Sequence, residues 1–593
     1  ESGETSRVRL REVRDMARAV WPVLKRAVAS GQILNPQCEL TEPDPDILCE
    51  YDVRIPLEGG SFVTANVFRS KTAKACGEQV PVVMCAHPYD NRLIPALGKT
   101  PLGGPPQQYR MIPQKGKPAF SKLTSWEAPD PNFWVPSGYA VVNMNMPGYA
   151  SSGGKPSLFS HEQTDAFSQA IDWVGSEPWC TGNVGLSGVS YLAMSQYGVA
   201  ATKSPRGVPR CLKAISPWEG MTDIYSDLFF EGGVEEKGFP VFWWFTEVKP
   251  TINCSVEEFV AIEGQLPQDL ALQHPFFDHY WSDRTPDLSV INLPMLVCAS
   301  FSDQGLHTRG SFRVFRNARS EHKWVYTHRS LKWDSYYSQE ALELTRDFFD
   351  CFLKGERDNG FLERAPVRLE VRSARDETHE VRGEAQWPLA RTQYRKLYLE
   401  SDGQTLGMTA SQNRGELVYE VRRGELRLRH VFEADTELTG YMKLHLEVEA
   451  RLGNAGGAPP DDMTLFVGIE KRRADGKRVP FYGSVGNHHD MVARGLLRVS
   501  RRRLDEMRST EWEPVLLNQS DEKLQPGQVV SVDIAINPSS TFFARGETLE
   551  LVISPREIVP SPPFVKDHSC NRGLHVIYVG GDTDSHLLIP VIP

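Results

Sequence analysis

The stretch GLSGVSYLAMSQ, residues 185–196, sets a short apolar run directly before a helical pattern and contains two serines, Ser187 and Ser190. Each serine has a glycine two positions before it. A strand that stops at a glycine-flanked serine and passes at once into a helix is typical of a nucleophile elbow, in which the serine occupies a strained turn. This stretch therefore predicts a strand–turn–helix unit of an α/β fold, with a candidate nucleophile at the turn.

The start of the helix favours Ser190 over Ser187. The sequence YLAMSQYGVAA, residues 191–201, forms a credible helix that begins directly after Ser190. A helix that began after Ser187 would open on Gly188 and Val189, which are poor helix formers. Neither serine fits the strict G-x-S-x-G pattern. From the residues alone, Ser187 as the nucleophile and a purely structural serine pair remain alternatives.

Short apolar runs alternate with helical patterns from about residue 50 to residue 365. This alternation indicates a parallel sheet with crossover helices, whose functional loops follow the strands. Residues 218–288 interrupt it with a dense aromatic cluster, FPVFWWF at 239–245, and we interpret them as a helical cap. An aromatic stripe is also typical of a plain hydrophobic core. We expect the substrate pocket to be lined by Trp218, Phe242, Trp243, Trp244 and Phe245.

The segments on either side have different patterns. Residues 1–49 begin with a charged helical pattern that lacks the apolar core of a signal peptide, and no apolar run in the chain is long enough to span a membrane. From residue 366 to residue 593, apolar and polar positions alternate, as in YMKLHLEVEARL at 441–452. The sequence thus predicts a helical N-terminal segment, an α/β domain and an all-β jelly-roll domain.

Composition and charge exclude several classes of function. The 593 residues carry a formal net charge of −10 and the arginine clusters include acidic residues, so we expect no nucleic-acid partner. The 10 cysteines lack C-x-x-C spacing, which favours reduced thiols, a cytoplasmic location and the absence of a metal centre. We also expect no organic cofactor and no membrane partner, and whether the chain forms a homo-oligomer is left open.

A family resemblance adds to this interpretation. The stretches GNVGLSGVSYLAMSQY and GYAVVNMNMPGYASSGG resemble the cocaine-esterase and Xaa-Pro dipeptidyl-peptidase group of α/β-hydrolases. The elbow of that group reads G-x-S-Y-x-G with a small residue at the end, and the matching residues here are Gly188, Ser190, Tyr191 and Ala193. The resemblance implies that Ser190 is the nucleophile and Ser187 a strand residue. It covers nearly the whole chain, since LQPGQVVSVDIAI and FFARGETLELVIS are similar to the group's jelly roll.

A serine nucleophile requires a histidine as base and a carboxylate that orients this histidine. In α/β-hydrolases the chain order is serine, acid, histidine. Asp303 follows the buried run PMLVCASF at 294–301, and His328 ends the next run, KWVYTH at 323–328. Position after a strand and resemblance therefore both predict a triad of Ser190, Asp303 and His328.

Three other histidines compete with His328 for the role of base. His307 lies four residues beyond Asp303, so acid and base would share one short loop, against the expected strand-by-strand order. His322 precedes its strand, and His87 precedes the serine in the chain. We therefore expect His328 to be the base. It departs from the P-W-x-H context of the family, because here the histidine follows VYT.

The resemblance also implies the oxyanion hole, the donors that stabilise the negative oxygen formed during acyl transfer. One donor is the backbone N–H of Tyr191, and the other is the hydroxyl of a tyrosine after an early strand, here Tyr89 in CAHPYDN. The alternative for Tyr89 is a tyrosine that simply packs at the strand end.

Together these features predict a serine hydrolase that cleaves a small-molecule ester with a hydrophobic group through an acyl-enzyme intermediate. One alternative is a peptidase or amidase of the dipeptidyl-peptidase type. Such an enzyme would hold the substrate amine with an acidic group, for which the candidates are Glu219, Glu231, Glu235 and Glu236. Another is acyl transfer to an acceptor in the biosynthesis of a natural product. A β-sandwich binding protein with an inactive hydrolase domain is the non-enzyme alternative.

Overall fold

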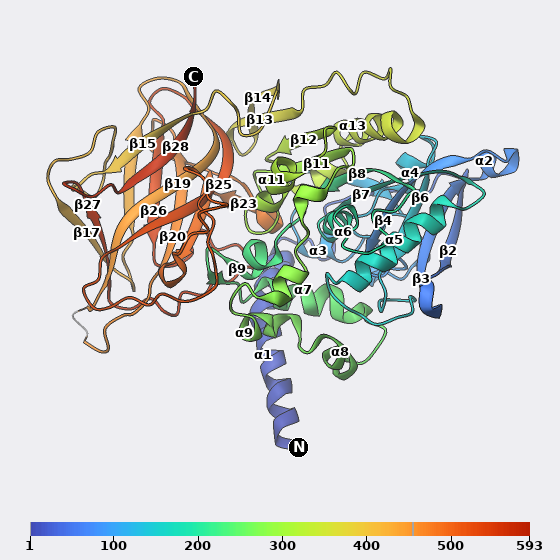
Figure 1. Cartoon of the computed structure of the whole chain (residues 1–593), viewed down its shortest axis with the longest axis horizontal. Coiled ribbons are helices and arrows are strands. Elements are labelled where there is room, and N and C mark those ends of the chain that lie inside the picture. The colour runs from blue at the N-terminus through green and yellow to red at the C-terminus, as the bar shows by residue number, and fades with distance from the viewer. Residues whose placement is uncertain (1, 454–455) are drawn as a thin grey trace.

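The computed structural model describes residues 2–453 and 456–593, which form an α/β unit and a β unit side by side (Figure 1). The chain starts with a long helix, α1 (Ser2–Ala29), which extends away from both units toward its N-terminus (Figure 1). Within the described ranges, no helix is long and apolar enough to cross a membrane.

One mixed sheet forms the centre of the α/β unit. Its strands lie in the order β2 (Ile47–Pro56), β3 (Phe62–Ser70), β6 (Ala140–Asn145), β4 (Val80–His87), β7 (Cys180–Val189), β8 (Leu212–Trp218), β11 (Met295–Ser300) and β12 (Lys323–His328). From β6 to β12 neighbouring strands are parallel. Every residue of β4, β6 and β11 is buried, as expected for central strands that are covered on both faces and are therefore mostly apolar.

Helices cover both faces of this sheet. The helices next to the elbow are α5 (His161–Gly175) and α6 (Tyr191–Ala200), and they pack together over β7 (Figure 1). Val82 and Met84 of β4 belong to the buried cluster on this face. Val83, between them, belongs to the cluster with α13 (Gln339–Phe349) on the opposite face. The alternation of side chains along a strand thus supplies both hydrophobic layers.

The segment between β8 and β11 is mostly helical. It contains the strand pair β9 (Phe230–Glu231) and β10 (Val234–Glu235), and the helices α7 (Phe239–Trp243), α8 (Val256–Glu263), α9 (Leu270–Gln273) and α10 (His279–Asp283). Figure 1 shows α7 close to α1. Ala19 and Val23 of α1 form a small buried cluster with Val241 and Phe242 of α7. The N-terminal helix therefore packs against the insertion.

The β unit consists mainly of antiparallel strands of six or more residues. They are β14 (Glu377–Glu384), β15 (Gln393–Leu399), β17 (Gly415–Glu420), β18 (Leu426–Val431), β19 (Thr436–Arg451), β20 (Thr464–Arg472), β24 (Ala493–Arg498), β25 (Val530–Phe543), β26 (Thr548–Ser554), β27 (Leu574–Val579) and β28 (His586–Ile592). The alternating apolar side chains of β19 are buried, from Met442 through Leu444 and Leu446 to Val448, as the sequence pattern predicts.

The two units are joined by β13 (Val367–Ala374). Val325 of β12 pairs with Val367, so β13 extends the sheet of the α/β unit by a parallel strand. Farther along β13, Arg372 pairs with Thr541 of β25. One strand therefore belongs to both sheets, and it begins directly after the domain boundary expected at residue 366.

Candidate active site

Ser190 lies alone in the turn between β7, which ends at Val189, and α6, which begins at Tyr191. Its φ of 62° and ψ of −116° are strained for a residue with a side chain. Gly188 has a φ of 145°, and a Cβ at this position would lie 2.5 Å from Cβ of Leu192. Strand and helix thus approach too closely for a larger residue. The predicted strand–turn–helix unit is confirmed, with Ser190 at its turn.

Ser187 lies inside β7 and is buried. Its hydroxyl oxygen is 3.2 Å from the hydroxyl oxygen of Tyr336. Ala193, the small residue of the motif, packs against Gly220. A Cβ added to Gly220 would lie 3.0 Å from the Cβ of Ala193. This close packing holds α6 against the loop that follows β8.

The histidine that contacts Ser190 is His307. Its Nε2 lies 3.2 Å from Oγ of Ser190, and its Nδ1 lies 2.5 Å from Oδ2 of Asp303. His307 and Asp303 share the loop between β11 and α11 (Thr308–Asn317), and the backbone N–H groups of His307 and Thr308 both donate to the Asp303 carbonyl. This tight turn brings acid and base together in spite of their short separation in sequence.

The prediction that His328 contacts Ser190 is wrong. His328 Nε2 lies 3.0 Å from Oε1 of Glu219, and its Nδ1 lies 3.1 Å from Oγ of Ser335. Because β12 stays paired with β11 up to His328, opposite Ser300, this side chain occupies the last strand position and not the loop beyond it. Both ring nitrogens of His328 are therefore engaged away from the serine.

Lys332 is a charged residue in contact with both this acid and this base. It belongs to α12 (Lys332–Tyr336), and its Nζ lies 2.7 Å from Oδ2 of Asp303 and 3.0 Å from Nδ1 of His307. Its side chain is 11% exposed. The sequence reasoning missed this lysine. The available signal was its position after β12, where an α/β-hydrolase normally carries its histidine.

Burial and charge set the protonation of this group. Burial would raise the pKa of Asp303, but the charges of Lys332 and His307 and their hydrogen bonds hold it well below its ordinary value. Burial and then the charge of Lys332 lower the pKa of His307, against the opposing effect of Asp303. A neutral histidine beside an ionised carboxylate is ready to accept a proton near neutral pH.

Tyr89 and Ser190 line the same cavity. The hydroxyl of Tyr89 accepts a hydrogen bond of 3.2 Å from Nε1 of Trp243, which leaves its own proton free for another acceptor. The backbone N–H of Tyr89 donates to Nδ1 of His87 at 3.1 Å, and burial lowers the pKa of His87 to about 3, so this imidazole is a neutral acceptor. Tyr191 begins α6, where backbone N–H groups have no partner within the helix.

The cavity beside Ser190 spans about 620 Å³, including the part that is open to solvent. Its aromatic wall includes Trp126, Phe159, Phe242, Trp243 and Trp333. Of the five aromatic residues predicted to line it, Phe242 and Trp243 do so. The side chains of the other three lie elsewhere: Trp218 packs on Tyr326 and Tyr336, Trp244 on Phe259, and Phe245 next to Lys249. Successive residues of a helical segment point in different directions, so a run of aromatics cannot all face one cavity.

Two carboxyl groups line the same cavity, and the sequence reasoning did not single out either of them. They belong to Glu127 and Glu247. Oε1 of Glu127 accepts a hydrogen bond of 3.1 Å from Nε1 of Trp333. Burial raises the pKa of Glu127 well above its ordinary value and that of Glu247 to about 7. The cavity therefore combines aromatic walls with two carboxyl groups whose raised pKa values favour the neutral form. A cation bound beside them would favour the ionised form.

The four acids proposed from sequence for an amine site lie outside this lining. Glu219 contacts His328, and Glu231 is paired with Arg309, Arg494 and Lys566. Glu236 is paired with Lys566, and Glu235 faces Lys237. Each of these four acids thus already has a partner side chain within the protein.

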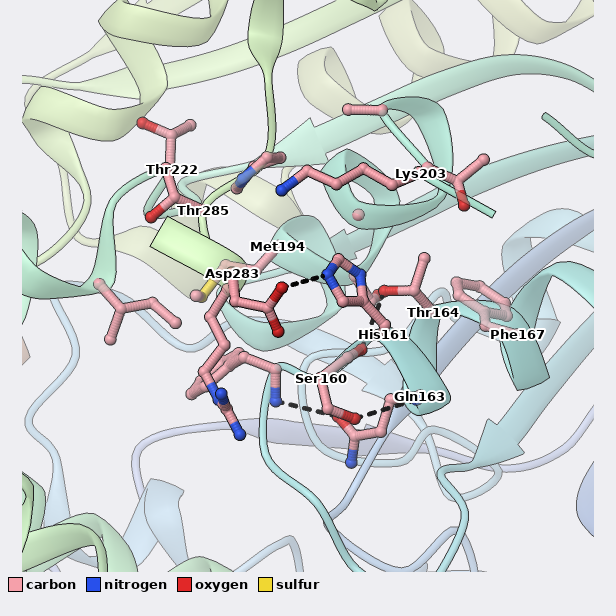
Figure 2. A pocket seen from close by; sticks show the side chains of 18 of the residues that line it. Ser160, His161, Gln163, Thr164, Phe167, Met194, Lys203, Thr222, Asp283 and Thr285 are labelled. Atoms are coloured by element: carbon pink, nitrogen blue, oxygen red, sulfur yellow. Dashed lines mark hydrogen bonds and ion pairs between the residues drawn. The ribbon is translucent and has the colours of Figure 1, made fainter. Parts of the chain in front are cut away.

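A second cavity of about 710 Å³ adjoins the first, and Figure 2 shows it from close by. The two cavities share Phe159, Tyr191, Met194 and Met221 in their linings. In the second, Nε2 of His161 on α5 lies 2.9 Å from Oδ1 of Asp283 on α10 (Figure 2). The helical insertion and the α/β unit therefore both contribute walls next to Tyr191.

Among the residues that the structure describes, two groups of side chains have metal-ligating atoms within 4.8 Å of one another: Glu219, Cys298 and His328, and Glu219, Asp303 and His307. Hydrogen bonds already account for both arrangements. His307 bridges Ser190 and Asp303, and His328 bridges Glu219 and Ser335. We therefore assign no metal to either group.

Comparison with known proteins identifies the family. Residues 59–331 match the model of the X-Pro dipeptidyl-peptidase (S15 family), and residues 359–588 match the X-Pro dipeptidyl-peptidase C-terminal non-catalytic domain. A CocE/NonD family hydrolase from Staphylococcus aureus superposes with a TM-score of 0.81 at 34% identity, over 92% of this chain and 94% of that chain. The chain belongs to the cocaine-esterase and Xaa-Pro dipeptidyl-peptidase group of α/β-hydrolases. The fold class and the family resemblance predicted from the sequence are thereby confirmed.

The chain is also similar to two more distant proteins. Cocaine esterase from Rhodococcus sp. (strain MB1 Bresler) is 26% identical over 400 residues, which cover 59% of this chain. The match spans 62% of the length of that curated relative. An α-amino acid ester hydrolase is 15% identical with a TM-score of 0.64, over 92% of this chain and 97% of that chain, and shares the fold.

Proposed function

We propose that this protein is a serine hydrolase that cleaves an ester bond of a small molecule through an acyl-enzyme intermediate. The observation that carries the proposal is the sequence of contacts from the Ser190 hydroxyl to the His307 imidazole and from there to the Asp303 carboxylate. Activation of a serine requires these three groups in this order. Membership of the S15 family supports the same chemistry.

In the first half of the proposed reaction, Nε2 of His307 takes the proton of Ser190 while Oγ attacks the carbonyl carbon of the ester. The carbonyl oxygen becomes negative and accepts hydrogen bonds from the backbone N–H of Tyr191 and the hydroxyl of Tyr89. The bond to the leaving oxygen then breaks. His307 donates its proton to that oxygen, and the alcohol leaves.

In the second half, water attacks the acyl group held on Ser190. His307 accepts a proton from the water, the bond from the acyl carbon to Oγ breaks, and the proton passes back to the serine. The aromatic wall with Trp126, Phe242 and Trp243 supports a hydrophobic acyl or alcohol group in the substrate.

A second candidate function is cleavage of an amide or peptide bond beside a free amine. The observation in its favour is the pair of carboxyl groups, Glu127 and Glu247, in the cavity of Ser190. A bound ammonium group would lower the pKa of both acids and be held by their charges. These two acids replace the four that the sequence suggested for this purpose.

Intact-mass measurement after treatment with a fluorophosphonate tests the nucleophile. We expect one adduct on the unchanged chain and on Ser187→Ala, and none on Ser190→Ala. An adduct that persists in Ser190→Ala, or no adduct on the folded chain, would overturn the proposal. Esters and amides that share one aromatic acyl group, each with and without a free amine, then decide between the two functions. Product analysis with an added alcohol or amine acceptor detects acyl transfer.

A further inference from the structure

Lys332 lies where the catalytic histidine of an α/β-hydrolase is normally delivered, in the segment after the last parallel strand that carries the triad. Here that segment places an ammonium group 2.7 Å from Oδ2 of Asp303. The histidine at Ser190 comes instead from the loop of Asp303 itself. Oδ2 of Asp303 therefore has two neighbours, the imidazole of His307 and the ammonium group of Lys332.

We propose that Lys332 is a positioning residue, which holds Asp303 in its ionised form against His307 and sets the lowest pH at which His307 can act as the base. This inference rests on the proposed function, in which His307 activates Ser190.

The hydrogen-bonding capacity of the three groups determines how they are arranged. Nζ of Lys332 has only protons to donate. If it donated one to Nδ1 of His307, the ring proton would move to Nε2, which could then not accept the proton of Ser190. Oδ2 of Asp303 must therefore accept from both Lys332 and His307, at 2.7 and 2.5 Å. Nδ1 then carries the ring proton, and Nε2 presents a lone pair to the serine.

The other oxygen of Asp303 does not weaken this arrangement. Oδ1 is buried and has no hydrogen-bond partner among the described residues. All the stabilisation of the carboxylate that hydrogen bonds provide thus comes through Oδ2. Removing Lys332 would leave His307 to satisfy this carboxylate by itself.

The charge of Lys332 acts on the base as well as on the acid. The ionisable groups that face His307 are Asp303 from its own loop, Lys332 from α12 and Glu219 directly after β8. Lys332 itself also faces Glu127 across the cavity. Burial opposes the charge of Lys332, but Asp303 and the two glutamates raise its pKa, so the ammonium persists. An ammonium 3.0 Å from Nδ1 disfavours the imidazolium form of His307.

The direction of the expected effect follows from this repulsion. Removing the cation raises the pKa of His307, so a larger fraction of the enzyme carries a protonated, inactive base at low pH. The rate of serine acylation should therefore fall at a higher pH in the variant than in the unchanged chain. The plateau above the midpoint should change much less.

The test measures the second-order rate constant of fluorophosphonate labelling against pH on the full chain. In Lys332→Met we expect the midpoint of the acid limb to move upward by about one pH unit. Lys332→Arg keeps the positive charge, and its midpoint should stay near that of the unchanged chain. Lys323→Met, at the opposite end of β12, removes a partly buried lysine far from the serine and should leave the profile unchanged.

The outcomes separate this inference from the proposed function. If His307→Ala abolishes labelling and the midpoint of Lys332→Met does not rise, the role of Lys332 is overturned and the proposed base stands. If His307→Ala labels normally, the proposed base itself is wrong. If labelling disappears in Lys332→Met and persists in His307→Ala, the lysine is the base. Lys332→Gln, with the same expected shift, replaces Lys332→Met if thermal unfolding shows that the methionine variant does not fold.

Discussion

Oγ of Ser190 lies 3.2 Å from Nε2 of His307, a histidine that follows β11. The histidine at the end of β12, His328, lies against Glu219 instead. Acid and base of the candidate site therefore come from one loop, although their order along the chain is still serine, aspartate, histidine. The position after β12 that is left free by this arrangement holds Lys332.

The two histidines can be distinguished by substitution. His307→Ala should lower ester turnover by at least about 10³-fold, because Ser190 loses its proton acceptor. His328→Gln should retain most activity and lower the free energy of unfolding by about 1–3 kcal/mol, because the amide cannot replace both buried contacts of the ring, with Glu219 and with Ser335. Turnover and urea unfolding of both variants check this. The reverse pattern, with activity lost only in His328→Gln, would restore His328 as the base.

Gly188 should be required for the elbow. Gly188→Ala places a Cβ 2.5 Å from Cβ of Leu192 at a φ of 145°. We expect it to lower the free energy of unfolding by about 2 kcal/mol or more and to slow fluorophosphonate labelling. Gly207→Ala is the matched control, because Gly207 has a φ of 69° with open space around it and should cost only about 1 kcal/mol. Equal costs at both positions would contradict the close approach of β7 and α6.

The hydroxyl of Tyr89 should act in the transition state. Tyr89→Phe keeps the ring and removes the donor, so we expect kcat to fall by about 10²-fold with little change in KM. Tyr149→Phe is the matched control, since its hydroxyl is also buried and has no hydrogen-bond partner among the described residues. An unchanged kcat in Tyr89→Phe would show that backbone donors alone stabilise the oxyanion.

Glu247 should make the stability of the protein depend on pH. Its pKa is raised to about 7 in the folded chain, so between its ordinary value and pH 7 the folded state binds more protons than the unfolded state. Stability from this group is therefore full at low pH and is lost as the pH rises through about 7.

The variant Glu247→Gln removes this loss. Above neutral pH we expect it to exceed the unchanged chain in free energy of unfolding by about 1–3 kcal/mol, and to show a smaller difference in acid. Thermal unfolding at several pH values measures the effect. Glu257→Gln, at an exposed position of α8, should show no such dependence. A parallel pH response of Glu247→Gln and the unchanged chain would contradict the raised pKa.

Features that depend on neighbours in the chain were predictable from the sequence. The buried strands of the α/β unit, the alternating pattern of β19 and the elbow at Ser190 all follow from local periodicity and from the small residues that a tight turn requires. The family resemblance rests on the same local motifs. It predicted Ser190 at the elbow and Asp303 as the acid, and the structure places Asp303 2.5 Å from the histidine that contacts Ser190.

Only the tertiary structure decided which histidine contacts the serine. His307 follows β11 and His328 is the last residue of β12 in the same sheet. The difference lies in the path of a tight turn and in the length of β12, neither of which has a sequence signature. The same holds for Lys332, Glu127 and Glu247, which come from separate segments and meet only in the cavity. A buried charge is stabilised by partners distant in the chain, so its role is decided by their positions in space and not by its neighbours in sequence.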